Sequence, residues 1–411
     1  MPPETKPIRI PRTDGKDSKE WLDAHGLVAR QPAIRSSDYE SVLHCPFQYY
    51  LSRRLGLVQS LRWSKALSRG SWFHKRFEYW NLTADEAKKK MEEEFEAREK
   101  ELTEICHTRG IKGDSKRNVL EREYQDMLCA SAWFEASMDT HPFLSQISKS
   151  FWEVLGTEIV AEYNHPQYGR LLAQFDMLLY HKTQGSVWIV DLKTTSHNPI
   201  ERLQTCPIEF QTQHYMHILK WMLDEQSLTK PFGVTRDAHL GGMMHVAVQK
   251  PTIEFGMKDR DYDEKEHTLS RGPRKGQVEI RRNYFGEPKI ENYIKRCKDW
   301  YQAKGEYEDK KVERETAPTV NVSKTDGMTL DTRYTTEYTN RLKLIHHYST
   351  VDPLPMNFPK SANYLVQFGK MSPFAPFYLT NTGEWPGFLD IEGFMVEDRD
   401  DVEVSVSAEA S

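Results

Sequence analysis

The chain has 411 residues and a net charge of −5 at pH 7, with 38% hydrophobic and 11% aromatic residues. These values predict a soluble globular protein with a large core, and no run of about 18 apolar residues exists that could span a membrane. The polar N-terminus MPPETKPIRI lacks the apolar stretch of a secretory signal, so we expect a cytoplasmic protein. Five cysteines are scattered without a C-x-x-C pair, which argues against a disulfide framework or a classical zinc site.

The N-terminal third is predicted to be a flexible arm followed by helices. Residues 1–34 show no periodicity, whereas Ser-Ser-Asp at 36–38 can cap a helix through YESVLHCPFQYYLSRRL. A helical region is expected over residues 80–145. It contains the charged helix TADEAKKKMEEEFEAREKELTE and a further helix over 117–139.

A basic segment at 51–76 carries seven Lys and Arg residues, no acid, and aromatic residues that include Trp72. Mixed basic and aromatic surface suits a phosphate backbone with stackable bases. We therefore expect Arg53 and Arg54 to guide the backbone of a nucleic acid. A basic helix face that only meets solvent explains the same composition equally well.

The pattern then changes to short apolar segments separated by turn signals such as HPQYG and HKTQG. Strands are predicted at 156–164, 170–180 and 186–194, a helix from Pro207, and a further strand at 239–250. Helices, three strands, a helix and a strand together predict an α/β (α+β) fold, with a mixed central β-sheet flanked by helices.

The remainder of the chain is expected to be an extension and a tail. Residues 271–282, RGPRKGQVEIRR, read as a basic turn, and the segment that begins YIKRCKDWY reads as helical. The acidic ending at 397–411 reads as a disordered tail. We therefore expect a core at 35–250 and a C-terminal extension at 251–396 that packs on it.

The segment WIVDLKTT at 188–195 contains a candidate catalytic site. Side chains alternate along a strand, so Asp191 and Lys193 point to one face. Asp176 lies in the preceding strand, and two carboxylates with the Leu192 carbonyl would suit Mg²⁺ or Mn²⁺. Lys193 would orient a water or help to deprotonate it, while the metal polarises a phosphate. An exposed salt bridge between Asp191 and Lys193 is the alternative.

Two further observations bear on this site. His74 lies on a predicted helix, and Gln211 with Tyr215 share one face of the helix that follows the strands. The alternative interpretations are that His74 is a packed or surface histidine, and that Gln211 and Tyr215 lie on an ordinary amphipathic helix face. If the pair lines the site, the amide and the phenol would position substrate and not bind metal.

The order of these motifs resembles the RecB-like branch of the PD-(D/E)XK nucleases over residues 36–250. The matching pieces are the CPFQYYL segment at 45–51, Gly70 with His74, Asp176, the segment Asp191-Leu192-Lys193-Thr194, and Gln211 with Tyr215. The resemblance implies a restriction-endonuclease-like core with a helical N-terminal insertion and a C-terminal extension.

The same resemblance implies roles for individual residues. The catalytic residues would be Asp176, Asp191 and Lys193. The metal ligands would be His74, Asp176, Asp191, the Leu192 carbonyl and, in the strand before Asp176, Glu158. Substrate contacts would come from Gln211, Tyr215, Thr194, Arg53 and Arg54.

Several RecB-like relatives hold an iron-sulfur cluster with one cysteine near the N-terminal motif and three near the C-terminus. Cys45 occupies the first place, but the corresponding segment at 358–379 contains no cysteine. We therefore expect no iron-sulfur cluster, since four thiolates are needed. Cys45 should be a buried structural residue, with aromatic packing in place of the cluster by Phe368, Phe374, Phe377 and Tyr378.

The resemblance implies a metal-dependent DNA exonuclease of phage or bacterial recombination, repair or DNA processing, with no P-loop motif in the chain. DNA would be its partner, joined by a single-strand-binding or recombination protein, in the bacterial cytoplasm or a phage-infected cell. An endonuclease of the same fold and a non-catalytic DNA-binding or scaffold protein remain alternatives. A glycosidase with two carboxylates would leave Lys193 without a role.

Overall fold

The computed structural model describes most of the chain between residues 30 and 361 and short pieces beyond. The described residues are 30–59, 65–108, 111–138, 142–147, 151–196, 198–268, 271, 278–303, 305–307, 310–312, 320–327, 332–351, 357–361, 366–367, 370–371, 374, 377, 394–396 and 404–409. Among them, no helix combines the length and apolar character that crossing a membrane would require.

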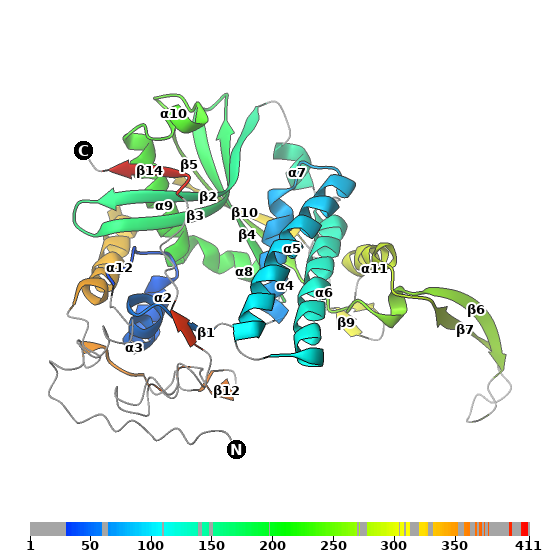
Figure 1. Ribbon diagram of the computed structural model, residues 1–411. Coiled ribbons are helices and arrows are strands. Elements are labelled where there is room, and N and C mark those ends of the chain that lie inside the picture. The colour runs from blue at the N-terminus through cyan, green and yellow to red at the C-terminus, as the bar shows by residue number, and fades with distance from the viewer. Residues whose placement is uncertain are drawn as a thin grey trace, which may run out of the picture.

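A six-stranded mixed sheet forms the centre of the molecule (Figure 1). The predicted meander is antiparallel, the strand after it joins in parallel, and each edge receives a strand from the C-terminal part. The predicted mixed sheet flanked by helices is therefore confirmed. In spatial order, the strands are β10 Val320–Asp326, β5 His239–Gln249, β4 Ser186–Thr195, β3 Gly169–His181, β2 Trp152–His165 and β14 Val406–Glu409.

Helices cover both faces of the sheet, which explains the apolar run from Val187 to Leu192 in β4. Val187 and Ile189 pack into one core with α9 (Phe210–Asp224) and α12 (Thr332–Thr350). Val190 and Leu192 face the opposite core, with α4 (Lys65–Glu78), α6 (Gly113–Ser137) and α11 (Ile290–Gln302). A strand buried on both faces needs apolar residues at even and odd positions alike. Asp191 is the exception in this stretch.

The remaining helices and paired strands lie around this sheet. The helices are α2 Asp38–His44, α3 Pro46–Tyr49, the π-helix Tyr50–Arg54, α5 Ala84–Thr108, α7 Pro142–Ile147, α8 Pro199–Thr205, the 3-10 turn Cys206–Ile208, α10 Thr229–Phe232 and the 3-10 turn Met257–Asp259. The short strand pairs are β1 Leu57–Gln59 with β13 Phe394–Val396, β8 Gly305–Tyr307 with β9 Lys310–Val312, and β11 Val366–Gln367 with β12 Lys370–Met371.

The first predicted helix is divided in two. Cys45 takes an extended conformation with φ −158° between α2 and α3 because Pro46 follows it, and a residue before proline avoids the helical region. Cys45 is fully buried beside Phe358, Phe374 and Phe377. The expected burial of Cys45 and the packing of Phe374 and Phe377 are thus confirmed, and Phe358 joins them. Phe368 and Tyr378 lie outside the described residues.

Two predictions for the C-terminal half are wrong. The basic turn at 271–282 gives way to a strand at its end, because β7 (Val278–Phe285) pairs with β6 (Asp261–Thr268) in a ribbon that projects from the body (Figure 1). Almost every β6 residue is exposed, so its charged sequence shows no apolar alternation. In the tail expected to be disordered, β14 pairs with β2 and extends the sheet.

The end of the predicted N-terminal arm is also ordered. Ile34 is buried, and its backbone bonds to Arg170 and Leu172 of β3. The arm can therefore include only residues before this contact, and residues 1–29 lie outside the described part of the chain.

Candidate active site

The site begins where β3 and β4 separate. Their antiparallel pairing ends at Met177 and Val190, and Asp176 lies just past that point. The Leu192 N–H donates to Asp176 Oδ2 at 2.6 Å, so a side chain takes the place of the missing strand contact. The N–H and C=O of one strand residue point to the same edge. The Leu192 carbonyl therefore faces the same opening as Asp176.

Strand β3 changes its facing at Asp176. Ala173 and Phe175 pack against the α9 side of the sheet, but from there on it is Leu178, not Met177, that faces this side. The pairing with β2 keeps its register across this point, from Thr157–Met177 to Ile159–Phe175, so the change is a local distortion of the strand and not a bulge. On the neighbouring strand, Glu158 has a positive φ of 48°, which is strained for a residue with a side chain. Both irregularities fall at the two acidic residues of the site.

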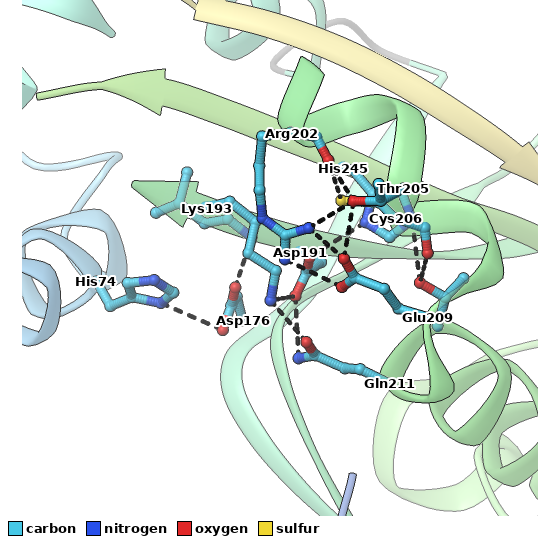
Figure 2. Close-up of polar contacts among 12 residues, drawn as sticks. His74, Asp176, Asp191, Lys193, Arg202, Thr205, Cys206, Glu209, Gln211 and His245 are labelled. Carbon is cyan, nitrogen blue, oxygen red and sulfur yellow. Dashed lines mark hydrogen bonds and ion pairs between the residues drawn. The ribbon is translucent and has the colours of Figure 1, made fainter. Parts of the chain in front are cut away.

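His74, Glu158 and Asp176 form a cluster suited to a metal ion. One ligand atom from each lies within 4.8 Å of the others, and His74 Nδ1 is 3.3 Å from Asp176 Oδ1 (Figure 2). Glu158 Oε2 accepts a hydrogen bond from Gln174, whereas the buried Oε1 has no hydrogen-bond partner among the described residues. A buried carboxylate oxygen without a partner is costly unless a cation reaches it.

The pKa values of Glu158 and His74 are both raised. Burial, and then the Asp176 carboxylate, raise the pKa of Glu158 to about 7. Burial alone would lower the pKa of His74, but the negative charges of Asp176 and Glu158 outweigh it and raise that pKa. Two carboxylates and one imidazole are a donor set that Mg²⁺ or Mn²⁺ accepts. The residues therefore fit a divalent cation.

Asp191 belongs to a second cluster, in which every charge has a partner (Figure 2). Its Oδ1 accepts hydrogen bonds from Lys193 Nζ at 2.9 Å and Gln211 Nε2 at 3.2 Å. Its Oδ2 accepts one from His245 Nδ1 at 3.1 Å. Lys193 Nζ also donates to Gln211 Oε1 at 2.7 Å. The carboxylate is only 2% exposed, so these donors replace its water.

The pKa shifts of this second cluster run in the opposite direction. Burial would raise the pKa of Asp191, but Lys193 and His245 outweigh it and hold the pKa below its usual value. Burial would lower the pKa of Lys193, but Asp191 and Asp176 outweigh it and raise that pKa. These carboxylates favour the protonated form of Lys193, which donates to Asp191 and Gln211.

The remaining predicted site residues lie at different distances from this centre. Gln211 contacts both Lys193 and Asp191, as a residue of the site would. Tyr215 is 7% exposed, packs edge-on against Phe175 and lines a small cavity next to the site. Thr194 lies where α4 crosses β4: a Cβ added at Gly70 would be 3.4 Å from its hydroxyl.

The predicted role of Arg53 and Arg54 is wrong. Arg53 is buried and bonds to Asp38 Oδ1 at 2.8 Å and to the Ala33 carbonyl at 2.8 Å. Arg54 donates to the carbonyls of Tyr348 at 2.9 Å and Val351 at 3.1 Å. The composition of the segment does not show that these two cations have partners inside the protein. Arg53 and Arg54 hold the N-terminal helices in place and do not form a surface for DNA.

Sequence reasoning missed His245. It is 1% exposed, lies opposite Asp191 in the parallel register of β4 and β5, and its Nε2 is 3.4 Å from the Thr212 hydroxyl. The signal available was a lone ionisable residue in the apolar run MMHVAV. A buried polar group there needs a partner, and the neighbouring strand's only acid in register is Asp191.

Comparison with known families assigns the chain to a nuclease superfamily. The family model described as the PD-(D/E)XK nuclease superfamily matches residues 36–254, more than half of the chain, and the chain belongs to this superfamily. The matched range begins just before α2 and ends just after β5, so it contains every residue of both clusters. Among curated proteins, no sequence matches the chain.

Proposed function

We propose that this chain is a Mg²⁺- or Mn²⁺-dependent DNA exonuclease of the RecB-like branch. The observation that carries the proposal is the pairing of two clusters: a carboxylate-rich group with an oxygen on Glu158 that has no partner among the described residues, and a protonated Lys193 held by Asp191 and Gln211. Nuclease chemistry needs a place for a divalent cation and a cation that meets the phosphate. The two clusters provide one of each.

His74, Glu158 and Asp176 are the proposed metal ligands. The Leu192 carbonyl, which faces the same opening as Asp176, is placed to complete the oxygen set. Asp191 is a further candidate, although both of its oxygens already accept hydrogen bonds. A bound Mg²⁺ or Mn²⁺ would polarise the phosphate and stabilise charge on the attacking and leaving oxygens.

The second cluster positions the reacting groups. The Lys193 ammonium carries three protons, and those not directed to Asp191 and Gln211 leave one donor for a phosphate oxygen or for the attacking water. Asp191 and Gln211 hold that ammonium from two sides. Fixed donors raise the share of substrate that is aligned for in-line attack. Lys193 therefore acts as an oriented donor.

The exonuclease assignment and the biological setting rest on the resemblance of the motifs to RecB-like nucleases. That resemblance supports DNA as the substrate and a role in phage or bacterial recombination, repair or DNA processing. It also supports a bacterial or phage-infected cytoplasm as the location, with a recombination or single-strand-binding protein as a partner. An endonuclease of the same superfamily is the second candidate, because both activities use the same site.

One assay tests the proposal. End-labelled linear duplex, labelled single strand and closed circular DNA are each incubated with protein and Mg²⁺, Mn²⁺ or EDTA. We expect cleavage of linear DNA with either metal, none with EDTA, and an intact circle. The same assay is run with Lys193→Ala, which removes the proposed donor. Its matched control is Lys182→Ala, since Lys182 directly follows β3, is exposed and pairs with Glu153.

The outcomes separate the candidates. Rapid cutting of the closed circle would replace the exonuclease proposal with an endonuclease. DNA binding without cleavage under every metal condition would show a non-catalytic protein that retains the fold.

A further inference from the structure

A cavity of about 190 Å³ lies against the site between the start of α2, strands β2 and β3, and α9. It is lined by Arg35, Ser36, Ser37, Val160, Leu172, Ala173, Gln174 and Tyr215. Pockets that hold whole drug-sized ligands measure about 300 Å³ or more. This cavity is therefore suited to a small group rather than to a complete nucleotide.

The polar side chains that line the cavity can all donate hydrogen bonds. Arg35 brings a positive charge, and Ser36, Ser37, Tyr215 and the Gln174 amide bring neutral donors. Among the described lining residues none is acidic. Ser36 is hydrogen-bonded to the Tyr215 hydroxyl, so two of the donors are fixed relative to each other. A lining of this kind favours an anion with several acceptor oxygens.

Two carboxylates next to lining residues, Asp38 and Glu158, do not cancel this preference. Asp38, next to Ser37, is buried and its Oδ1 lies 2.8 Å from Arg53 Nε. Glu158 accepts the hydrogen bond from Gln174 at 2.6 Å and belongs to the proposed metal site. The first carboxylate is thus neutralised by its own cation, and the second would be neutralised by a bound metal ion.

The cavity shares walls with the proposed active site. Gln174 lines the cavity and bonds to Glu158 of the metal cluster. Tyr215 lines it from α9, one helical turn after Gln211, which contacts Lys193. A group held in the cavity is therefore one side chain away from the proposed metal ligands.

We propose that this cavity binds a terminal phosphate monoester of the DNA strand that the site cleaves. A monoester carries a charge of about −1.5 to −2 and three free acceptor oxygens at neutral pH. A phosphodiester within the strand carries one charge and offers two. The charge of Arg35 and the neutral donors that remain beside the Ser36–Tyr215 hydrogen bond match the monoester better. The proposal rests on the nuclease function, and it gives that function a physical reason to act at strand ends.

Cleavage and binding are measured on one labelled DNA sequence in three forms: with a 5′-phosphate, with a 3′-phosphate, and with hydroxyls at both ends. The wild-type protein should cleave one phosphorylated form at least about tenfold faster than the unmodified form, measured as kcat/KM. Which end is preferred identifies the source of the monoester. In EDTA, fluorescence anisotropy should show tighter binding of that same form.

Arg35→Ala should bring the ratio between the phosphorylated and unmodified forms close to one. Arg117→Ala, at an exposed arginine of α6, is the matched control and should keep the wild-type ratio. If Arg35→Ala does not fold, as judged by circular dichroism, the double change Ser36→Ala with Ser37→Ala should reduce the ratio instead. Inorganic phosphate should also compete with the preferred form for binding to the wild-type protein and not to Arg35→Ala.

Equal cleavage and equal binding of all three DNA forms by the wild-type protein would overturn the cavity proposal while the nuclease function stands. Absence of cleavage with any form and metal would overturn the nuclease function. The anisotropy in EDTA then still decides the cavity proposal, because it needs no turnover: a phosphate preference that depends on Arg35 supports it, and no preference refutes it.

Discussion

The two acidic clusters on either side of the β3–β4 opening differ in how their charge is balanced. In the first, Glu158 has a buried oxygen without a partner and a pKa raised to about 7 by burial and by Asp176. In the second, Asp191 accepts hydrogen bonds from Lys193, Gln211 and His245, and its pKa is lowered. Both clusters lie within the matched superfamily range.

This difference indicates where a metal ion is needed. The negative charge of Asp176 adds to burial in raising the pKa of Glu158, and a divalent ion would offset that repulsion. A carboxylate already surrounded by donors gains much less from a metal. We therefore assign metal binding to the first cluster and orientation of substrate to the second. Variants that separate metal affinity from turnover test this division.

The largest effect is expected from Asp176→Asn. Asp176 contacts His74, accepts the Leu192 N–H and is a member of the metal group, so its loss should affect both metal and strand geometry. We expect nuclease rates at least about a thousandfold lower and no calorimetric binding of Mn²⁺. Asp224→Asn, at an exposed acid of α9, is the control. Retained Mn²⁺ affinity in Asp176→Asn would show that Asp176 is not a metal ligand, and the division of roles between the two clusters would then be wrong.

Lys193→Ala should separate the two functions. Lys193 contacts Asp191 and Gln211 but is not a member of the metal group. We expect a loss of at least about a hundredfold in turnover, with Mn²⁺ affinity within about threefold of the wild type. A variant that turns over normally would remove Lys193 from the mechanism, and a collapse of Mn²⁺ affinity would assign it to the metal site.

His245→Ala should have a smaller effect of the same kind. It would leave Asp191 Oδ2 without its donor, and loss of such a supporting contact typically costs about 10- to 100-fold in activity. The loss should appear in kcat and not in KM. His245→Asn, whose amide can donate from a similar position, should recover part of the rate. If both variants fold and cleave like the wild type, His245 has no role in positioning Asp191.

The smallest effect concerns pH. Only ionised Glu158 can bind a metal, so with a pKa of about 7 the Mn²⁺ affinity should rise about tenfold from pH 6 to pH 8 and then level off. His74, whose pKa is raised by Asp176, adds to the rise in the same direction. Calorimetry across this range measures the change. Glu158→Gln should bind more weakly and lose most of the pH dependence, and an unchanged profile would contradict the assignment of Glu158.

The same shift predicts how pH affects folding without metal. The pKa of Glu158 in the folded protein is above its ordinary value of 4.5, so the folded state binds more protons between these pH values. The free energy of unfolding of the metal-free protein should therefore fall as pH rises from 4.5 to about 7. Mn²⁺ should reverse this trend, because it binds the ionised form.

Much of the fold was predictable because its determinants are local. The meander β2–β3–β4 shows apolar segments between turn signals, and the alternation of β4 puts Asp191 and Lys193 on one face. Strands β6 and β14 were missed for different reasons. β6 is charged and exposed, and β14 is a four-residue edge strand paired with residues more than two hundred positions earlier.

The remaining errors in predicting the site arise because contacts between distant segments cannot be seen in the sequence. Arg53 finds Asp38 fifteen residues earlier, and Arg54 finds the Tyr348 carbonyl 294 residues later. A count of basic residues in one segment contains no information about such partners. His245 was missed for the same reason, since its partner Asp191 lies 54 residues away and only the parallel pairing of β4 with β5 brings them together.

Anomalous scattering from crystals soaked in Mn²⁺ tests the central assignment most directly. The account predicts a Mn²⁺ peak in contact with His74, Glu158 and Asp176, with Lys193 still bonded to Asp191. The control is a crystal of Asp176→Asn treated in the same way, which should show no peak there. A Mn²⁺ peak that contacts Asp191 but neither His74 nor Glu158 would contradict the division between the two clusters.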